Sequence, residues 1–229
     1  QGSGTTYDYL TLKYDSEGNL LWERRYNGPG NGVDEAHALF VDENRNIYIA
    51  GRSVGSGTNY DYATLKYNSD GNLLWERRYN GPGNGGDEAN ALFVDGNGNV
   101  YVTGSSQGSG TTYDYLTLKY DSEGNLLWER RYNGPGNGVN EAHALFVDGN
   151  RNIYITGRSV GSGTNYDYAT IKYVQGVSIS EEKENKLKKR LTKRDKIYDI
   201  TGKLIEGKLR KGIYFQETGK EIKKILILK

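Results

Sequence analysis

The sequence predicts an all-β protein built from a repeated four-stranded antiparallel unit. The first observation is a period of 53 residues, because Tyr7, Tyr60, Tyr113 and Tyr166 occupy one position in successive repeats. The second is that each repeat holds four short segments rich in aromatic and β-branched residues, which is typical of strands. The third is that Gly-, Asn- and Asp-rich connectors separate these segments, as hairpin turns require. Such a period indicates an array of identical supersecondary units.

The elements follow in order along the chain. One complete repeat runs from Asp34 to Gly86 and a second from Asp87 to Val139. The strands expected in the first complete repeat are Glu35–Asp42, Asn46–Ser53, Tyr60–Tyr67 and Leu73–Asn80. Residues 1–33 supply only the last two strands of a repeat, and Asn140–Tyr173 supplies the first three. Four antiparallel strands per repeat is the pattern of a β-propeller blade, so we expect a propeller arc of thirteen strands without long helices.

The arc is shorter than a closed propeller, which has about four to eight blades. We expect the missing blades to come from sequence upstream of Gln1, and the last blade to present an unpaired edge that favours self-association. Residues 3–55 and 109–161 differ at only three positions. Near-identical blades repeat the same groups, whereas catalysis needs different groups that converge on one point. We therefore expect that the protein is not an enzyme and has no catalytic residues.

Two segments of the repeat resemble the bacterial β-propeller repeats called SBBP repeats. They read EAHALFVDENRNIYIAG and YDYATLKYNSDGNLLW, and the segment VDGNGNVYVTG, from Val94 to Gly104, is the best match to the family pattern. The resemblance extends over residues 1–173. It implies a propeller fold in a surface or secreted protein, and it implies no particular activity, because these repeats occur in many unrelated surface proteins.

The chain changes character after Tyr173. From Val174 onward it carries 16 Lys and Arg against 8 Asp and Glu, whereas the preceding part carries 14 against 21. This asymmetry suggests parts with different roles. We expect propeller repeats over residues 1–173, a charged linker over 174–195 and a small C-terminal β domain over 196–229. The chain has no Cys, which excludes disulfides, and no apolar run of the roughly 20 residues that would span a bilayer.

The C-terminal segment resembles the sorting domain of cargo of the type IX secretion system. The residues that carry this resemblance are Tyr198, Asp199, Gly202 and Lys203, then Gly212, Ile213 and Tyr214, then the basic and aliphatic run Lys223–Lys229. The resemblance implies export from the cell through recognition by the secretion machinery. The alternative is a basic terminal sheet that covers the edge of the propeller.

Tyr-Asp-Tyr triplets are the first candidate site. Their tyrosines are Tyr7 and Tyr9, Tyr60 and Tyr62, Tyr113 and Tyr115, and Tyr166 and Tyr168. Aromatic faces beside an acceptor could bind carbohydrate, although blade packing with a capped loop explains the triplets as well. His37 and His143 have Asn90 at the equivalent position, and this exchange favours a structural role over a metal ligand or catalytic base.

Asp- and Asn-rich turns could in principle bind calcium. They are Asp42–Asn46, Asp95–Asn99 and Asp148–Asn152. They lack the alternating acids and the distal Glu of a calcium loop, so turns stabilised by Asp and Asn side chains are the favoured interpretation. The basic run Lys186–Lys196 could contact nucleic acid, but it contains no aromatic residue on which a base could stack. A solvated linker is therefore the favoured interpretation, and no nucleic acid is expected as a partner.

These observations predict a secreted or cell-surface repeat protein that acts as a non-catalytic binding or structural module and leaves the cell through its C-terminal signal. The alternative is the propeller portion of a larger secreted carbohydrate-active enzyme whose catalytic residues lie outside these 229 residues. The expected partners are the secretion machinery and a protein or carbohydrate ligand. No metal or other cofactor is expected.

Overall fold

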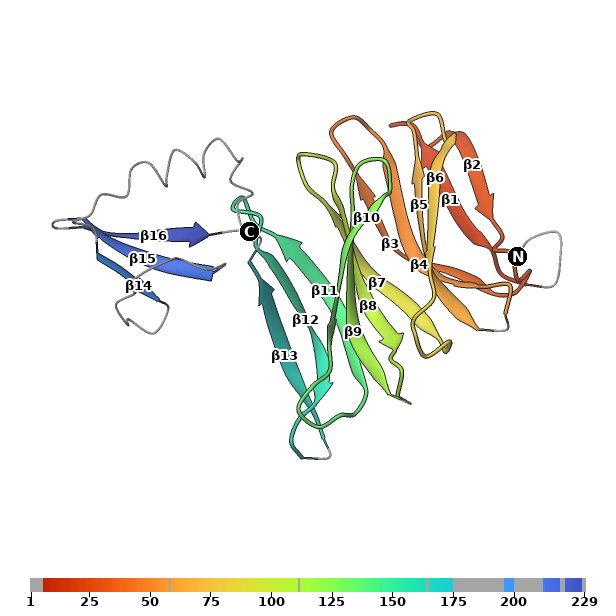
Figure 1. The fold of residues 1–229 in the computed structure, drawn as a ribbon. Coiled ribbons are helices and arrows are strands. Elements are labelled where there is room, and N and C mark those ends of the chain that lie inside the picture. The colour runs from red at the N-terminus through yellow and green to blue at the C-terminus, as the bar shows by residue number, and fades with distance from the viewer. Residues whose placement is uncertain are drawn as a thin grey trace. The chain divides into compact units, whose positions relative to one another are not determined.

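The computed structural model describes residues 6–57, 59–110, 112–163 and 165–174, together with the backbone of three strands within 196–227. The chain divides into two compact units, residues 1–174 and 175–229. The described residues form strands and turns without a helix (Figure 1). The predicted all-β fold is therefore confirmed.

The first unit, which we call the repeat unit, contains thirteen strands in antiparallel sheets. The first sheet has two strands, β1 (Tyr9–Tyr14) and β2 (Leu20–Tyr26). The second has four, β3 (Asp34–Val41), β4 (Ile47–Val54), β5 (Tyr60–Tyr67) and β6 (Leu73–Tyr79). The third also has four, β7 (Asp87–Val94), β8 (Val100–Gln107), β9 (Tyr113–Tyr120) and β10 (Leu126–Tyr132). The fourth has three, β11 (Asn140–Val147), β12 (Ile153–Val160) and β13 (Tyr166–Tyr173).

Strands within each sheet follow one another in chain order, as in a meander. The first strands of successive sheets lie side by side, β3 against β7 and β7 against β11 (Figure 1). The hydrophobic core lies between sheets, since one cluster joins Tyr48, Tyr62 and Trp75 of the second sheet to Leu116 and Leu118 of the third. Sheets that bury both faces against neighbouring sheets are propeller blades, so the predicted blade architecture is confirmed.

A β-bulge interrupts the first strand of each sheet that contains a first strand, namely β3, β7 and β11. The pairing of β3 with β4 shifts between Ala36 and Ala38, which leaves His37 without a partner across the sheet. Asn90 and His143 occupy the same place in β7 and β11. A bulge locally bends a strand and redirects the side chain of the extra residue. His37 and its equivalents are thereby directed out of the sheet.

A glycine lies opposite each bulge because the bulged strand comes too close for a side chain. A Cβ on Gly104 would lie 1.9 Å from the carbonyl oxygen of Glu88, and a Cβ on Gly51 would lie 2.0 Å from that of Glu35. Only glycine tolerates such a close approach of backbone to backbone. The repeated Ala/Thr-Gly step of the second strand is therefore required by the bulge.

The second unit contains a three-stranded antiparallel sheet of β14 (Lys196–Asp199), β15 (Gly212–Thr218) and β16 (Glu221–Ile227). Tyr198 pairs with Phe215, and Asp199 pairs with Tyr214. The predicted linker, apart from Val174, lies outside the described residues. The predicted domain boundaries therefore remain predictions.

Candidate functional site

A cluster of polar and aromatic side chains lies at the start of the innermost strands of the first two complete blades. We call it the rim cluster, and its members are Glu35, His37, Arg52, Tyr60 and Glu88. The Arg52 guanidinium contacts Glu35 through two nitrogens, at 2.8 Å from Nε and 2.5 Å from Nη2 to the same Oε2 atom. Its Nη1 donates to Glu88 of the next blade at 3.1 Å. One guanidinium therefore ties two blades together through two carboxylates.

An aromatic ring and an imidazole complete the rim cluster. The Arg52 guanidinium carbon lies 4.5 Å from the centre of the Tyr60 ring, which is a cation–π contact. His37 Nδ1 lies 3.4 Å from a Glu88 oxygen, and its Nε2 lies 3.8 Å from a Glu35 oxygen. The side chains of Glu35 and Glu88 are 39% and 35% exposed, so their free oxygen positions face solvent. The cluster can donate and accept hydrogen bonds beside an aromatic surface.

The charges of the cluster shift the Arg52 equilibrium toward the protonated form. Burial acts to lower the pKa of Arg52, but the hydrogen bond to Glu35 and the charge of Glu88 outweigh it and raise this pKa above its ordinary value. The guanidinium is therefore a permanent cation at this position.

Four of the five members of the cluster recur two blades further on, in the last blade, where no counterpart of Glu88 is present among the described residues. Arg158 pairs with Glu141 at 2.8 Å and lies 4.6 Å from the centre of the Tyr166 ring. In the intervening blade Ser105 takes the place of the arginine and Asn90 that of the histidine. This alternation gives the site a period of two blades. Sequence reasoning missed the cluster, although the Arg52, Ser105, Arg158 alternation was a visible signal of it.

The structure separates the eight tyrosines of the predicted Tyr-Asp-Tyr surface into two groups. The second tyrosine of each of the first three triplets is buried between blades, at 1% exposure for Tyr9, 0% for Tyr62 and 1% for Tyr115. Burial raises the pKa of Tyr62 well above its ordinary value. These three cannot present a ring to a ligand in this arrangement, because the next blade covers them.

The remaining tyrosines of the triplets reach the surface. They are Tyr7 at 61% exposure, Tyr166 at 49% and Tyr168 at 96%, with Tyr60 and Tyr113 half-buried. Asp61, the acid of one triplet, pairs with Arg78 at 3.0 Å and so supports the blade. A ligand surface built on the triplets is thus reduced to these five tyrosines, which include Tyr60 and Tyr166 of the rim clusters.

The exchange of His37 for Asn90 has a geometric reason. His37 Nδ1 lies 3.1 Å from the Ala89 carbonyl oxygen, and Asn90 Nδ2 donates to the Ala142 carbonyl oxygen at 2.9 Å. Each side chain therefore reaches the backbone carbonyl at the equivalent position of the following blade. This contact supports the structural interpretation of the position.

The Asp- and Asn-rich turns are stabilised by their own side chains. Asp42 accepts hydrogen bonds from the Asn46 backbone N–H at 2.8 Å, the Asn46 side-chain amide at 2.9 Å and the Tyr48 hydroxyl at 3.1 Å. Burial acts to raise the pKa of Asp42, but these bonds outweigh it and lower the pKa. The described residues contain no group of three His, Cys, Asp or Glu side chains that could hold a metal ion.

Residues of the predicted sorting motif fall partly on the second unit's sheet. Tyr198 and Asp199 belong to β14, and Gly212, Ile213 and Tyr214 belong to β15. Gly202 and Lys203 lie outside the described residues. The described residues include no helix that is long and apolar enough to cross a membrane.

Comparison with known proteins supports the repeat part of the chain. The family model described as SBBP, a β-propeller repeat, matches residues 77–110, from the last strand of one blade to the loop after the second strand of the next. No curated protein matches the chain. The family match does not extend to the C-terminal unit, so the sorting domain remains a prediction.

A solved structure is also similar, the periplasmic gluconolactonase of Pseudomonas aeruginosa. The identity is 11% and the TM-score is 0.39, over 94% of this chain and 62% of that chain. This chain thus spans less than two thirds of that structure. At this identity and score, the likeness transfers neither a reaction nor a substrate.

This comparison nevertheless overturns one prediction. We expected the protein not to be an enzyme, because its blades are nearly identical. The similar structure is an enzyme with a propeller fold. The prediction that the protein is not an enzyme was therefore wrong.

Proposed function

We propose that the repeat unit is a binding module of an exported protein and that it holds a hydroxyl-rich ligand, such as a polysaccharide, along the rim clusters. The observation that supports this most is the half-exposed set of Arg52, Glu35, Glu88 and Tyr60. Carboxylates accept and a guanidinium donates hydrogen bonds to hydroxyl groups, while a tyrosine ring packs against the apolar face of a sugar. These groups are already held in place by their mutual contacts, so little ordering is needed on binding.

The repetition of the cluster favours a polymeric ligand. Arg158, Glu141 and Tyr166 repeat the contacts of Arg52 with Glu35 and Tyr60 two blades further along the chain. Two sites on one rigid unit that bind one polymer gain avidity, because the second binding step is intramolecular. A long polysaccharide is therefore favoured over a monosaccharide.

Binding of the full chain to a polysaccharide panel tests this proposal. We expect the double variant Arg52→Ala, Arg158→Ala to bind at least about tenfold more weakly, because truncated central contacts at binding sites often cost more than 1 kcal/mol each. Arg130→Ala is the matched control, since Arg130 is exposed and contacts Trp128 away from the rim. Equal binding by the double variant and wild type, with both folded, would contradict the proposal, as would failure of wild type to bind any member of the panel.

The rim cluster also favours a second candidate, a hydrolytic role within a larger secreted carbohydrate-active enzyme. It brings an imidazole within 3.4 Å of one carboxylate and 3.8 Å of another, and such groups can transfer protons in catalysis. Product release from the same polysaccharides, lost in Glu88→Gln with binding retained, would support this role. Binding of the polysaccharides without release of product would contradict the hydrolytic role and support the binding module.

We also propose that the C-terminal unit directs export, on the strength of its resemblance to type IX sorting domains and its basic charge. The test joins residues 174–229 to a periplasm-directed reporter in a bacterium with that system. Transport to the cell surface, lost when Gly212 and Tyr214 are replaced by Ala, is the expected result. A reporter that stays in the periplasm with and without the tail would leave only a role as a cover for the propeller edge.

A further inference from the structure

The last sheet of the repeat unit exposes a face that the preceding blades bury. On β13 the alternate residues Tyr168, Thr170 and Lys172 are exposed, and Tyr168 reaches 96% exposure. The equivalent residues of β5 are buried by the following blade, with exposures of 0% for Tyr62, 0% for Thr64 and 8% for Lys66. The exposed β13 face therefore carries residues at the positions that a neighbouring blade covers elsewhere in the repeat unit.

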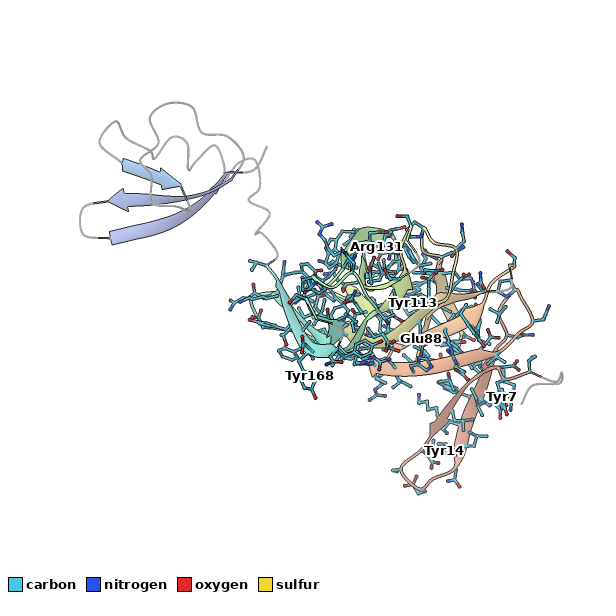
Figure 2. All side chains as sticks on the ribbon, turned by 90° about the horizontal axis from the view of Figure 1, so that it is seen from below. Tyr7, Tyr14, Glu88, Tyr113, Arg131 and Tyr168 are labelled. Carbon is cyan, nitrogen blue, oxygen red and sulfur yellow. The ribbon has the colours of Figure 1, made fainter. Side chains whose placement is uncertain are left out.

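The first sheet exposes the opposite face. On β1, Leu10 is 44% exposed, Leu12 40% and Tyr14 53%. The equivalent residues of β9 are buried by the preceding blade, namely Leu116 at 0%, Leu118 at 0% and Tyr120 at 3%. Figure 2 shows Tyr14 and Tyr168 at the two ends of the repeat unit.

Contacts inside the chain show how these two kinds of face fit together. The Tyr9 hydroxyl donates to the Ala63 carbonyl at 3.4 Å, and the Tyr62 hydroxyl donates to the Leu116 carbonyl at 3.3 Å, 54 residues further on in both cases. The interface is thus a fixed geometry that the sequence repeats. The same bond joins the third pair, Tyr115 and Ala169, at 3.2 Å.

Lysine side chains make a second repeated bond across this interface. Lys13 donates to the Ser69 carbonyl at 2.7 Å, and Lys66 donates to the Ser122 carbonyl at 3.0 Å. Tyr168 and Lys172 occupy the same repeat positions as these donors. The residues that occupy the acceptor positions in the first sheet are Leu10 and Ser16, which lie one repeat before Ala63 and Ser69. Both acceptors lie on the first sheet of the chain or in the turn that joins its two strands.

We propose that the β11–β13 face binds the β1–β2 face of a second molecule of this chain, head to tail. Tyr168 then donates to Leu10 of the second molecule and Lys172 to Ser16, and the apolar side chains of Leu10, Leu12 and Tyr14 become buried. The two faces differ, so the interface is heterologous and links molecules into rows or closed rings.

Sedimentation of the full chain over a range of concentrations tests the interface. We expect wild type to self-associate, and Tyr168→Asp or Leu12→Asp to do so at least about tenfold more weakly, because central tyrosine and buried apolar contacts dominate such interfaces. Tyr168 is almost fully exposed, so its replacement leaves the fold intact. Leu127→Asp is the matched control, because Leu21, Leu74 and Leu127 stay about half exposed in all three blades and no neighbouring blade covers them.

A mixture of the two variants gives the sharpest result. The Tyr168→Asp protein keeps an intact β1 face, and the Leu12→Asp protein keeps an intact β13 face, so the mixture should form a dimer and no larger species. A monomeric wild type, association of either variant equal to wild type, loss of association in the Leu127 control, or a mixture that stays monomeric would each overturn the proposal.

Discussion

Replacement of Asp87 by Asn is expected to stabilise the repeat unit at neutral pH. Asp87 is fully buried, and one of its oxygens accepts from the Gly81 N–H at 2.6 Å while Oδ1 has no hydrogen-bond partner among the described residues. The third repeat carries Asn140 here, and its amide donates to the Gly138 carbonyl at 2.8 Å while its oxygen accepts from Ser159 at 2.6 Å. The chain thus already contains the neutral alternative.

The magnitude follows from the groups involved. The Asp87→Asn substitution replaces an unpartnered buried oxygen with a donor and removes a desolvated charge, a gain of about 1.5 kcal/mol. For a chain of this size that is a rise of roughly 3–6 °C in melting temperature. The reverse substitution in the third repeat, Asn140→Asp, should lower the melting temperature by a similar amount, because it introduces the same buried charge.

The gain should depend on pH. Burial raises the pKa of Asp87, although the hydrogen bond from the Gly81 N–H and the charge of Arg131 oppose the shift. A group whose pKa is raised on folding contributes stability at low pH and loses it as pH rises through the folded-state pKa. Calorimetry at about pH 4 and about pH 7 should therefore show the larger advantage of Asp87→Asn at the higher pH. A variant less stable than wild type at neutral pH, or an advantage that does not change with pH, would refute this reasoning.

Three further predictions concern the contacts between and within blades. Gly104→Ala should lower stability by about 3 kcal/mol in denaturant unfolding, because its Cβ would meet the Glu88 carbonyl, whereas Gly96→Ala, with open space around it, should be close to neutral; equal effects would show that the bulge is not rigid. Tyr62→Phe should lower the free energy of unfolding by about 1 kcal/mol, because the hydroxyl bond to the Leu116 carbonyl is lost, whereas Tyr168→Phe should not change it in the monomer. A larger loss for Tyr168→Phe in thermal melts would contradict the assignment of Tyr62 to a buried interface between blades and of Tyr168 to an exposed face. His37→Asn should be tolerated and His37→Ala should lose about 1 kcal/mol, because only Asn preserves the bond to the Ala89 carbonyl; a destabilised Asn variant would argue against this contact.

The strands could be predicted almost to the residue, because local patterns determine them. The expected strand Tyr60–Tyr67 has the observed bounds, and the expected Glu35–Asp42 is observed as Asp34–Val41. Alternation of side chains and turn residues at a fixed period are visible in the sequence. The bulge at His37 was not predicted, because an extra residue in a strand leaves no periodic signal, although the opposed Gly51 was a possible sign of it.

The candidate site could not be predicted in the same way, because it depends on contacts between blades. Arg52 meets Glu88 only because β3 and β7 lie side by side, and no local pattern shows that. Tyr62 and Tyr168 illustrate the same limit, since they occupy one position of the repeat and yet are 0% and 96% exposed. Burial at that position is decided by whether another blade follows.

Hydrogen exchange of one duplicated peptide tests the central claim, that neighbouring blades rather than local sequence protect each blade. Residues 9–26, which contain β1 and β2, are identical in sequence to residues 115–132, which contain β10 and most of β9. The β1 strand has one unpaired edge, whereas β9 is paired on both sides. Unpaired, exposed amides exchange faster than those in a core sheet. Mass spectrometry of this peptide from the full chain at low concentration should show two populations of equal size, one fast and one slow. A single slow population would contradict the claim.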